Sequence, residues 1–421
     1  MMINSFIDKH ARVIIVIFIS IITIALVCSV CLKRTSGDFD IYYQAGKNYL
    51  ERQPVYIPHD GGIEEFKYSP FFSLVFSPFA MLPKTTALYC WSILNIFLLY
   101  LIFYFLFRLG LMLFKRASDF WLLFLLFALA GRYIFINIKI GQVNIALCFL
   151  LTLVMYFQIR NKDFWAGFFL ALSLMIKLFP AIFLVYFVLR KRFKIIYFAA
   201  LMCAVFLFIP SFYSGFGLEL RYIREWFDLL RSTPPGIIYS VKNSSLLSYF
   251  SWLFVVQHQG VPTLDFQFIS RDLPKIVYYF WMAGCLTLFT VFFRDSFLKK
   301  DMDSEQQYMD YSCLLVCGLL FNPLAYLNAL VILIIPYFFI LRYAIYFAKS
   351  RRFSVMLWAL IIGAFIVTML NNKVFFSDVN DFYRVLEYKL PMWTMILVYF
   401  SLLLVKSKCK KEGVCAGRLI G

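Results

Sequence analysis

A carboxylate and a lysine occupy unusual places in this sequence and together suggest chemistry at a phosphate. Asp38 is followed by Tyr42, Ala45 and Tyr49 at the spacing of one helix face. Lys177 interrupts a long apolar run. A carboxylate can take the proton of an attacking hydroxyl, and a cation can stabilise a departing phosphate. These residue types suit transfer of a group from a phosphate-linked donor to a hydroxyl.

Polar side chains at other predicted turns could contact a sugar or a phosphate. They are Gln142, Asn144, Asn243, Ser244, Ser245, Asn322 and Asn328. Each also has a structural interpretation, because amides and hydroxyls cap helices and satisfy backbone groups that a nearby proline leaves free. Asp38 and Lys177 also have structural interpretations. Asp38 could be a helix N-cap, and Lys177 could be a lysine whose side chain extends toward the membrane surface. Asp40 falls on another helix face, where we expect it to be solvated.

The elements that would hold these residues belong to a membrane protein. The chain has 421 residues, a mean hydropathy of +0.79 and only 15% charged residues, whereas about a quarter of residues are charged in soluble domains. Residues 12–32 form an apolar run long enough to cross a hydrocarbon core of roughly 30 Å. The run ends without a small-residue cleavage site, so we interpret it as a retained signal anchor.

The distribution of basic residues predicts the orientation of the chain in the membrane and does not indicate a nucleic-acid partner. The formal net charge is +18, but the basic residues are scattered between apolar segments instead of being gathered in one motif. Cytoplasmic loops are enriched in lysine and arginine, which predicts that both termini and the tail 407–421 are cytoplasmic. The long loops 33–84 and 211–272 would then form an outward catalytic face. Each contains an apolar stretch too short to span, such as 68–83, which we expect to be interfacial or re-entrant.

The hydropathy pattern predicts an all-α polytopic fold with about twelve transmembrane helices in a single integral membrane domain, 1–421. The predicted crossings are residues 12–32, 85–107, 119–135, 141–159, 164–176, 178–190, 195–211, 273–293, 310–325, 328–347, 353–370 and 391–406.

Some of these crossings are too short to pass through a membrane fully. The segments 164–176 and 178–190 have basic residues at their outer ends, and about 13 residues cover only about 20 Å. Their turn, near Lys177, must therefore lie below the outer surface. A second turn near Asn322 and Pro323 follows the same logic. Charges and irregular backbone at such depth require a cavity or buried surroundings, so we expect a cavity that opens outward.

The ten cysteines do not indicate a disulfide framework, because most lie in predicted spans. The spacings of Cys28 with Cys31 and of Cys313 with Cys317 could be drawn as metal or redox pairs. We favour small buried apolar side chains for both pairs.

Six segments carry loose motifs in a characteristic order. They are SGDFDIYYQAGKNYLERQPVY, FKYSPFFSLVFSPFAMLP, GQVNIALCFLL, AGFFLALSLMIKLFPAIFLV, KNSSLLSYF and LLFNPLAYLNALVILIIPYF. In this order and membrane context they resemble the landmarks of glycosyltransferase family 87. The family contains the polytopic enzymes related to mycobacterial polyprenol-phosphate-mannose-dependent α-1,2-mannosyltransferases. The likeness runs from about residue 36 to about residue 340 and leaves the last two spans unsupported.

The resemblance implies a GT-C type fold and an inverting transfer from a polyprenyl-phosphate sugar at the outer membrane face. The family's proposed catalytic aspartate, in the pattern D-F-x-x-Y-Y, falls on Asp38. The tyrosines of that pattern, expected to bind substrate, fall on Tyr42 and Tyr43. The lysine of the K-x-x-P pattern falls on Lys177, which would bind the donor phosphate.

Other family patterns imply further substrate-binding residues. The G-Q-x-N pattern falls on Gly141, Gln142 and Asn144, the N-x-S pattern falls on Asn243 and Ser245, and Asn322 and Asn328 lie in the last motif. One departure concerns the P-x-x-W-x-H pattern of many members, where this chain has Pro323, Tyr326 and Asn328. An asparagine cannot carry the charge of an imidazolium, so donor or acceptor preference is expected to differ.

The resulting hypothesis is a glycosyltransferase of a bacterial inner membrane that uses a polyprenyl-phosphate sugar, with mannose as the expected sugar, and a glycolipid or glycan acceptor. No metal cofactor is expected, because polyprenyl phosphate is a good leaving group and the outer loops have no Asp-x-Asp pair. The alternatives are a carrier or flippase for lipid-linked oligosaccharide, a surface-polysaccharide polymerase or ligase, and a membrane scaffold. A carrier often has repeat-related halves, which this sequence does not show.

Overall fold

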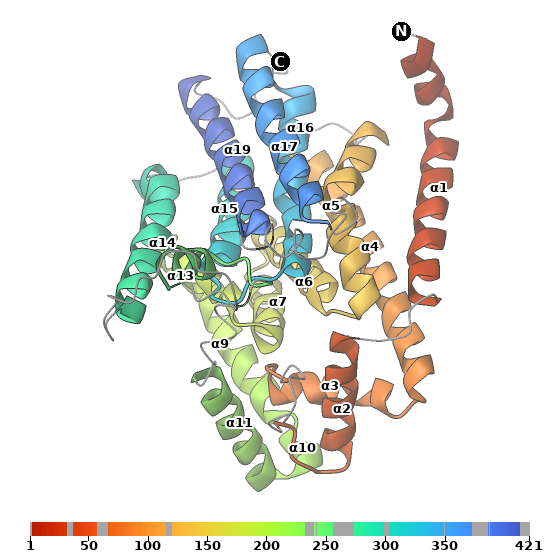
Figure 1. The fold of residues 1–421 in the computed structure, drawn as a ribbon, viewed down its shortest axis with the longest axis vertical. Coiled ribbons are helices and arrows are strands. Elements are labelled where there is room, and N and C mark those ends of the chain that lie inside the picture. The colour runs from red at the N-terminus through yellow and green to blue at the C-terminus, as the bar shows by residue number, and fades with distance from the viewer. Residues whose placement is uncertain are drawn as a thin grey trace. The chain divides into compact units, whose positions relative to one another are not determined.

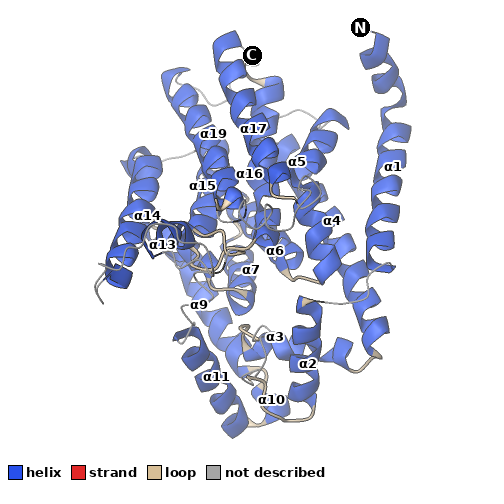
Figure 2. Cartoon of the chain, viewed as in Figure 1, coloured by secondary structure: helices blue, strands red, loops and turns tan. Residues whose placement is uncertain are grey.

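The structure is a computed structural model that describes residues 2–31, 37–56, 66–114, 120–231, 240, 242–255, 273–298, 303–348, 350–372, 386 and 388–412. Every regular element in these ranges is a helix, and no strand occurs among them (Figure 2). The predicted all-α class is therefore confirmed. The chain divides into two compact units, Met1–Ser232 and Thr233–Gly421.

The helices of the first unit are joined mostly by short turns (Figure 1). They are α1 (Met2–Cys31), α2 (Asp38–Leu50), α3 (Pro70–Ala80), α4 (Lys84–Phe114), α5 (Phe120–Ile140), α6 (Asn144–Ile159), α7 (Asp163–Ile176), the 3-10 helix η1 (Phe179–Ala181), α8 (Ile182–Leu189), α9 (Phe193–Phe208), α10 (Ser211–Ser214) and α11 (Phe216–Arg231). Gln142 lies in the turn between α5 and α6, and Lys177 in the turn after α7. Both turns lie where the sequence predicted them.

The second unit is also helical. Its elements are α13 (Leu246–Val255), α14 (Leu273–Leu298), α15 (Ser304–Phe321), the 3-10 helix η2 (Leu327–Leu333), α16 (Ile334–Tyr346), α17 (Arg351–Leu370) and α19 (Leu390–Glu412). Asn322 directly follows α15, which confirms the predicted turn before Pro323.

By length and composition, 8 of the described helices could cross a membrane. They comprise Val13–Cys31, Lys84–Phe114, Trp121–Ile140, Phe193–Ser214, Val277–Arg294, Leu327–Tyr346, Arg351–Leu370 and Leu390–Cys409. The remaining predicted crossings correspond to α6, α7, η1 with α8, and α15. Of these, α7 has 14 residues and α8 has 8, as expected for the short hairpin around Lys177. The apolar helices confirm an integral membrane protein.

An aromatic core holds α2 against α3 and α4. Phe39 and Tyr42 of α2 lie 5.7 and 5.6 Å from Phe76 of α3, measured between ring centroids. Trp91 of α4 lies 5.1 Å from Phe76, and all four rings are buried. Buried aromatic rings in tilted and edge-to-face arrangements contribute both apolar area and specific orientation. This core fixes the beginning of α2, where Asp38 is found.

Helices α7 and α9 pack closely because Gly167 has no side chain. A Cβ at Gly167 would lie 2.7 Å from the carbonyl oxygen of Ile195. Small residues at helix contacts allow two backbones to approach each other in membrane proteins. Because α7 continues from this contact to Ile176, the contact fixes where Lys177 leaves the helix.

The nine cysteines that the structure describes carry free thiols. Cys313 and Cys317 are buried with their sulfur atoms 3.9 Å apart, so the apolar interpretation of this pair is confirmed. Cys28 and Cys31 lie on an exposed side of α1, so the prediction of burial was wrong for them.

Candidate active site

Asp38 is the first residue of α2 and is half-buried. Gly37 occupies the cap position, and no side chain caps this helix, so the interpretation of Asp38 as an N-cap was wrong. Tyr42 and Tyr49, on the predicted face of Asp38, are fully buried. The carboxylate therefore stands at the edge of the buried face of α2.

Asp40 lies on a different side of α2, as the helical spacing predicted. Its carboxylate forms an ion pair with the ammonium of Lys84 at 3.0 Å, and both side chains remain about half exposed. Exposed ion pairs of this kind contribute little to stability. Asp40 is thus a natural control for Asp38.

Three side chains from distant parts of the chain share hydrogen bonds beside α2. The hydroxyl of Tyr42 donates to Oε1 of Gln142 and lies 2.8 Å from the hydroxyl of Tyr68, which in turn lies 3.3 Å from the same Oε1 atom. The N–H group of Val143 also donates to that oxygen, at 2.9 Å. The carbonyl end of the Gln142 amide is therefore fixed by protein donors.

The hydroxyl of Tyr42 keeps its proton in this environment. Burial, together with the nearby Tyr68 and Asp38, raises the pKa of Tyr42 well above the usual value of 10.0. A buried phenol that stays neutral can donate to Gln142 without adding a second negative charge near Asp38.

The turn that carries Gln142 packs directly against the start of α2. Gly141 has φ +66°, and a Cβ at this position would lie 2.6 Å from Cβ of Phe39. The indole nitrogen of Trp91 donates to the carbonyl oxygen of Gly141 at 2.8 Å. Glycine is required here because the backbone is left-handed and the space is already filled. Asp38, next to Phe39, is held beside this turn.

Lys177 is linked to the same turn through Asn144. Its backbone is extended after the end of α7, and its ammonium donates to Oδ1 of Asn144 at 2.7 Å. Asn144 is the first residue of α6 and is fully buried, and its Nδ2 donor has no hydrogen-bond partner in the described part of the chain. Val143 takes the cap position and no side chain caps α6, so the capping interpretation of Gln142 and Asn144 was wrong.

A further contact ties the segment of Tyr68 to that of Lys177. The hydroxyl of Ser69 donates to the carbonyl oxygen of Met175 at 2.6 Å, and the backbone N–H of Ser69 reaches the same oxygen at 3.4 Å. The first unit thus brings together four segments that are far apart in sequence: the start of α2, the 68–69 turn, the Gly-Gln-x-Asn turn and the end of α7.

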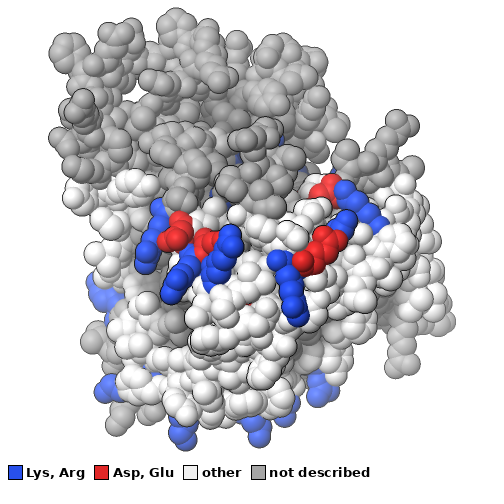
Figure 3. Space-filling view, turned by 90° about the horizontal axis from the view of Figure 1, so that it is seen from below, with Lys and Arg blue, Asp and Glu red and all other residues white. Residues whose placement is uncertain are grey.

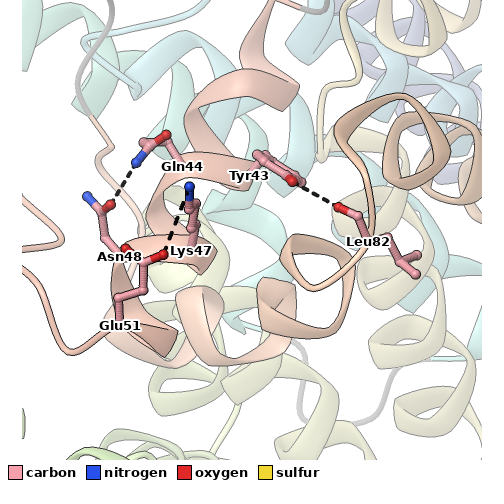
Figure 4. Close-up of polar contacts among 6 residues, drawn as sticks. All are labelled: Tyr43, Gln44, Lys47, Asn48, Glu51 and Leu82. Carbon is pink, nitrogen blue, oxygen red and sulfur yellow. Dashed lines mark hydrogen bonds and ion pairs between the residues drawn. The ribbon is translucent and has the colours of Figure 1, made fainter.

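Tyr43 lies on another side of α2 from Tyr42. Its hydroxyl donates to the carbonyl oxygen of Leu82 at 2.8 Å, and Figure 4 shows it directed toward the loop that contains Leu82. The same view shows Gln44 and Lys47 each paired with a residue one turn later. The predicted substrate contact of Tyr43 stays a prediction.

In the second unit, Asn243 and Ser245 bind the turn around Pro323. The amide nitrogen of Asn243 and the hydroxyl of Ser245 donate to the carbonyl oxygen of Pro323 at 2.8 and 2.9 Å. Oδ1 of Asn243 accepts from the N–H of Ala325 at 3.1 Å. Ser245 Oγ also accepts from the N–H of Ser248 at 3.0 Å, as an N-cap does. The capping interpretation is confirmed for Ser245, whereas Asn243 binds backbone groups of the Pro323 turn instead of capping α13.

Asn322 satisfies backbone groups next to the proline, as its alternative interpretation predicted. Its side chain exchanges hydrogen bonds with Leu324, donating at 2.9 Å and accepting at 3.2 Å. Asn328 is half-buried on η2, where the family pattern has a histidine. The substrate contacts predicted for Asn243, Ser245, Asn322 and Asn328 stay predictions.

Sequence reasoning missed two polar residues that the structure places prominently. Tyr68 belongs to a quoted motif, but only its bonds to Tyr42 and Gln142 identify it as a member of the cluster. Lys389, in the second unit, is 1% exposed and donates to the carbonyl oxygen of Ser240 at 2.8 Å. Lys389 could have been identified from the sequence, because it lies at the predicted outer end of the last span.

Within the described residues, no group of three His, Cys, Asp or Glu side chains comes together that could hold a metal. The prediction that the reaction needs no metal rests on the chemistry of the leaving group and stays a prediction.

Together, the apolar helices and the polar cluster define an integral membrane protein with a site suited to transfer chemistry. A family model described as Glycosyltransferase family 87 matches residues 66–323. The chain belongs to glycosyltransferase family 87. The matched range contains Lys177 and the amides of Gln142 and Asn144, whereas Asp38 precedes it.

Two solved structures have low similarity to the chain. One is ArnT from Cupriavidus metallidurans bound to undecaprenyl phosphate, with a TM-score of 0.39 and 11% identity over 95% of this chain and 80% of that one. The other is ArnT from the same organism in the apo state, with a TM-score of 0.37 and 12% identity over 95% and 79%. Comparison with curated proteins gives no match.

Proposed function

We propose that this glycosyltransferase is an inverting enzyme that moves a sugar from a polyprenyl-phosphate donor to a glycolipid or glycan hydroxyl. The observation that carries the proposal is the link between the start of α2 and the end of α7 through the Gly-Gln-x-Asn turn. Asp38 is next to Phe39, which packs against this turn, and Lys177 bonds Asn144 in the same turn, which supports roles for both residues in one site. A GT-C type fold is part of the proposal.

In the proposed reaction, Asp38 acts as the general base. It accepts the proton of the acceptor hydroxyl while the hydroxyl oxygen attacks the anomeric carbon of the donor sugar. A bond forms between that oxygen and the anomeric carbon, and the bond from the anomeric carbon to the phosphate oxygen breaks. Attack from the side opposite the phosphate inverts the configuration.

Lys177 stabilises the charge that develops on the departing polyprenyl phosphate. A compact ammonium suits this role, and its bond to Asn144 restricts where it can lie. Nδ2 of Asn144 is a buried donor available for a hydrogen bond to the same phosphate or to the sugar. Because one cation and amide donors can support this leaving group, we propose that no metal is needed.

We place the reaction at the outer face of a bacterial inner membrane, with both termini cytoplasmic, and we propose mannose as the donor sugar. The distribution of basic loops supports the orientation. Loss of transfer with EDTA and its return with Mg²⁺ or Mn²⁺ would contradict metal independence.

The decisive experiment measures transfer by the purified protein in lipid. Wild type and Asp38→Asn are incubated with radiolabelled polyprenyl-phosphate mannose and a panel of glycolipid acceptors. We expect label in an acceptor only with wild type, and NMR of the product should show the inverted anomer. No transfer from any polyprenyl-phosphate sugar, together with movement of intact lipid-linked sugar across vesicles, would instead identify a carrier.

A further inference from the structure

Helix α11 presents three different faces. Glu219, Tyr222 and Trp226 are buried against the rest of the first unit. Arg221, Arg224, Asp228 and Arg231 are exposed on the opposite side. Between these faces runs an apolar stripe at the three- and four-residue spacing of a helix, composed of Phe216, Leu220, Ile223, Phe227 and Leu230.

Within the part of the chain that the structure describes, the apolar stripe is exposed or only half-buried. Phe216 is 61% exposed and Phe227 is 45% exposed, and the other three members of the stripe are only half-buried. Full burial of one such side chain is worth about 1.5–3 kcal/mol, so leaving the whole stripe in water would be unfavourable. Continuous exposed apolar surfaces mark contacts with membranes or other molecules.

The stripe continues the surface of a membrane-spanning segment. The candidate span Phe193–Ser214 exposes Tyr197, Leu201 and Phe208 along its length. Phe212, at its end, is 92% exposed and is followed four residues later by Phe216. Figure 1 shows α11 following α9 and α10 directly. The rings of Phe208 in α9 and Phe216 in α11 are stacked with their centroids 6.2 Å apart, so the apolar surface of the candidate span extends onto α11.

The charged face of α11 has the composition of a surface that meets headgroups or water. Arg221 pairs with Glu225 at 2.8 Å, while Arg224 and Arg231 add further positive charge. Figure 3 shows basic side chains next to acidic ones on the face of the molecule seen from below. Arginine stems can lie along apolar surface while the guanidinium reaches the polar layer.

We propose that α11 is an interfacial helix: its apolar stripe contacts lipid acyl chains at the boundary of the bilayer, and its arginine face contacts the headgroup layer. Amphipathic helices with aromatic and aliphatic residues on one face and arginines on the other bind bilayers in this way. Lipid is the occupant because the stripe joins the exposed apolar surface of a candidate membrane span through the contact of Phe208 with Phe216.

The proposed lipid contact is relevant to the candidate site, because residues on the buried face of α11 form hydrogen bonds with segments next to α2 and Tyr68. The hydroxyl of Tyr222 donates to the carbonyl oxygen of Gln53 at 2.6 Å, just after α2. The indole nitrogen of Trp226 donates to the carbonyl oxygen of Lys67 at 3.2 Å, next to Tyr68. The helix thus binds the residues that follow the end of α2 and the residue that precedes the 68–69 turn of the site.

Photocrosslinking from neighbouring positions tests the proposal. The full-length protein with p-benzoylphenylalanine in place of Phe227, or in place of Asp228 as the matched control, is reconstituted in vesicles of phosphatidylethanolamine and phosphatidylglycerol. Both variants are first required to match wild type in gel-filtration profile and thermal unfolding. After irradiation, mass spectrometry of the α11 peptide should show phospholipid adducts several-fold more abundant at 227 than at 228.

Two results would overturn the proposal. Equal lipid labelling at 227 and 228 would show that the stripe is not directed toward lipid. Adducts at 227 with a peptide, either from residues 256–272 of the same chain or from a second copy, in place of phospholipid, would show that protein covers the stripe. Repeating the experiment at Phe216, whose side chain is more exposed, should give phospholipid adducts as well.

Discussion

The ammonium of Lys177 lies 2.7 Å from Oδ1 of Asn144, although the two residues are 33 positions apart in the chain. The lysine directly follows α7, a helix too short to span a membrane. The asparagine is the first residue of α6, the helix that precedes α7. A polar pair at this place brings a positive charge next to the turn that also contacts the start of α2.

Replacement of Asp38 by asparagine should remove the general base. The amide keeps the size of the side chain but cannot accept the proton, so we expect the transfer rate to fall by about 10²–10⁴-fold. The matched control is Asp40→Asn, since Asp40 is exposed and paired with Lys84, and it should retain most activity. Equal losses in the two variants would contradict the assigned role.

Replacement of Lys177 by glutamine should weaken stabilisation of the leaving phosphate. We expect kcat to fall by about 10²–10³-fold, the usual effect of losing one electrostatic stabiliser, and Lys177→Arg to recover part of it. Lys47→Gln serves as control, because Lys47 is exposed and pairs with Glu51 on the same helix. Steady-state transfer kinetics give the comparison, and unchanged kcat in Lys177→Gln would exclude the role.

Gly141→Ala should disturb the site without touching a candidate catalytic group. Its φ of +66° is unfavourable for alanine by about 1–2 kcal/mol, and the new methyl group would collide with Phe39. We expect lower thermal stability and reduced transfer. Gly217→Ala is the control, because a Cβ there meets nothing within 4 Å. The idea fails if both variants unfold at the wild-type temperature and transfer normally.

Tyr42→Phe should loosen Gln142 by removing one donor to its Oε1 atom. Because Tyr68 and Val143 still donate to that oxygen, we expect a loss of about 1 kcal/mol in stability and a measurable drop in transfer. Tyr197→Phe, on an exposed side of α9 outside the cluster, removes a tyrosine hydroxyl at a position that is 63% exposed. It should leave transfer close to wild type, and the reverse order of effects would contradict the cluster.

Glu219 should make stability depend on pH. Burial raises the pKa of this carboxyl above the usual value of 4.5, so the folded protein holds the proton more tightly than the unfolded chain. The stabilisation is complete below pH 4.5 and decreases as pH rises through the folded pKa. Glu219→Gln should make the stability less dependent on pH in this range. Thermal unfolding measured between pH 4.5 and 8 tests it, and parallel profiles would contradict the assignment.

The turn of Lys177 could be predicted because basic residues flank an apolar run that is too short for two full crossings. The buried face of α2 followed from the spacing of its tyrosines in the same way. The partner of Lys177 could not be predicted, since helical periodicity carries no information about which turns meet. Tyr68 was missed for this reason, and so was the cap position of Gly37, which depends on backbone conformation rather than residue type.

The bonds of Asn243 to Pro323 and Ala325 span 80 and 82 residues, and this separation has a consequence for biosynthesis. Chains emerge from the ribosome N-terminus first, so the polar groups of Asn243 leave the ribosome long before their partners. The loop before α13 can reach its final arrangement only after α15 has been synthesised. Truncation within α15 should therefore leave Asn243 without its partners Pro323 and Ala325, whereas all residues of the 38–177 cluster have already been synthesised by that stage of translation.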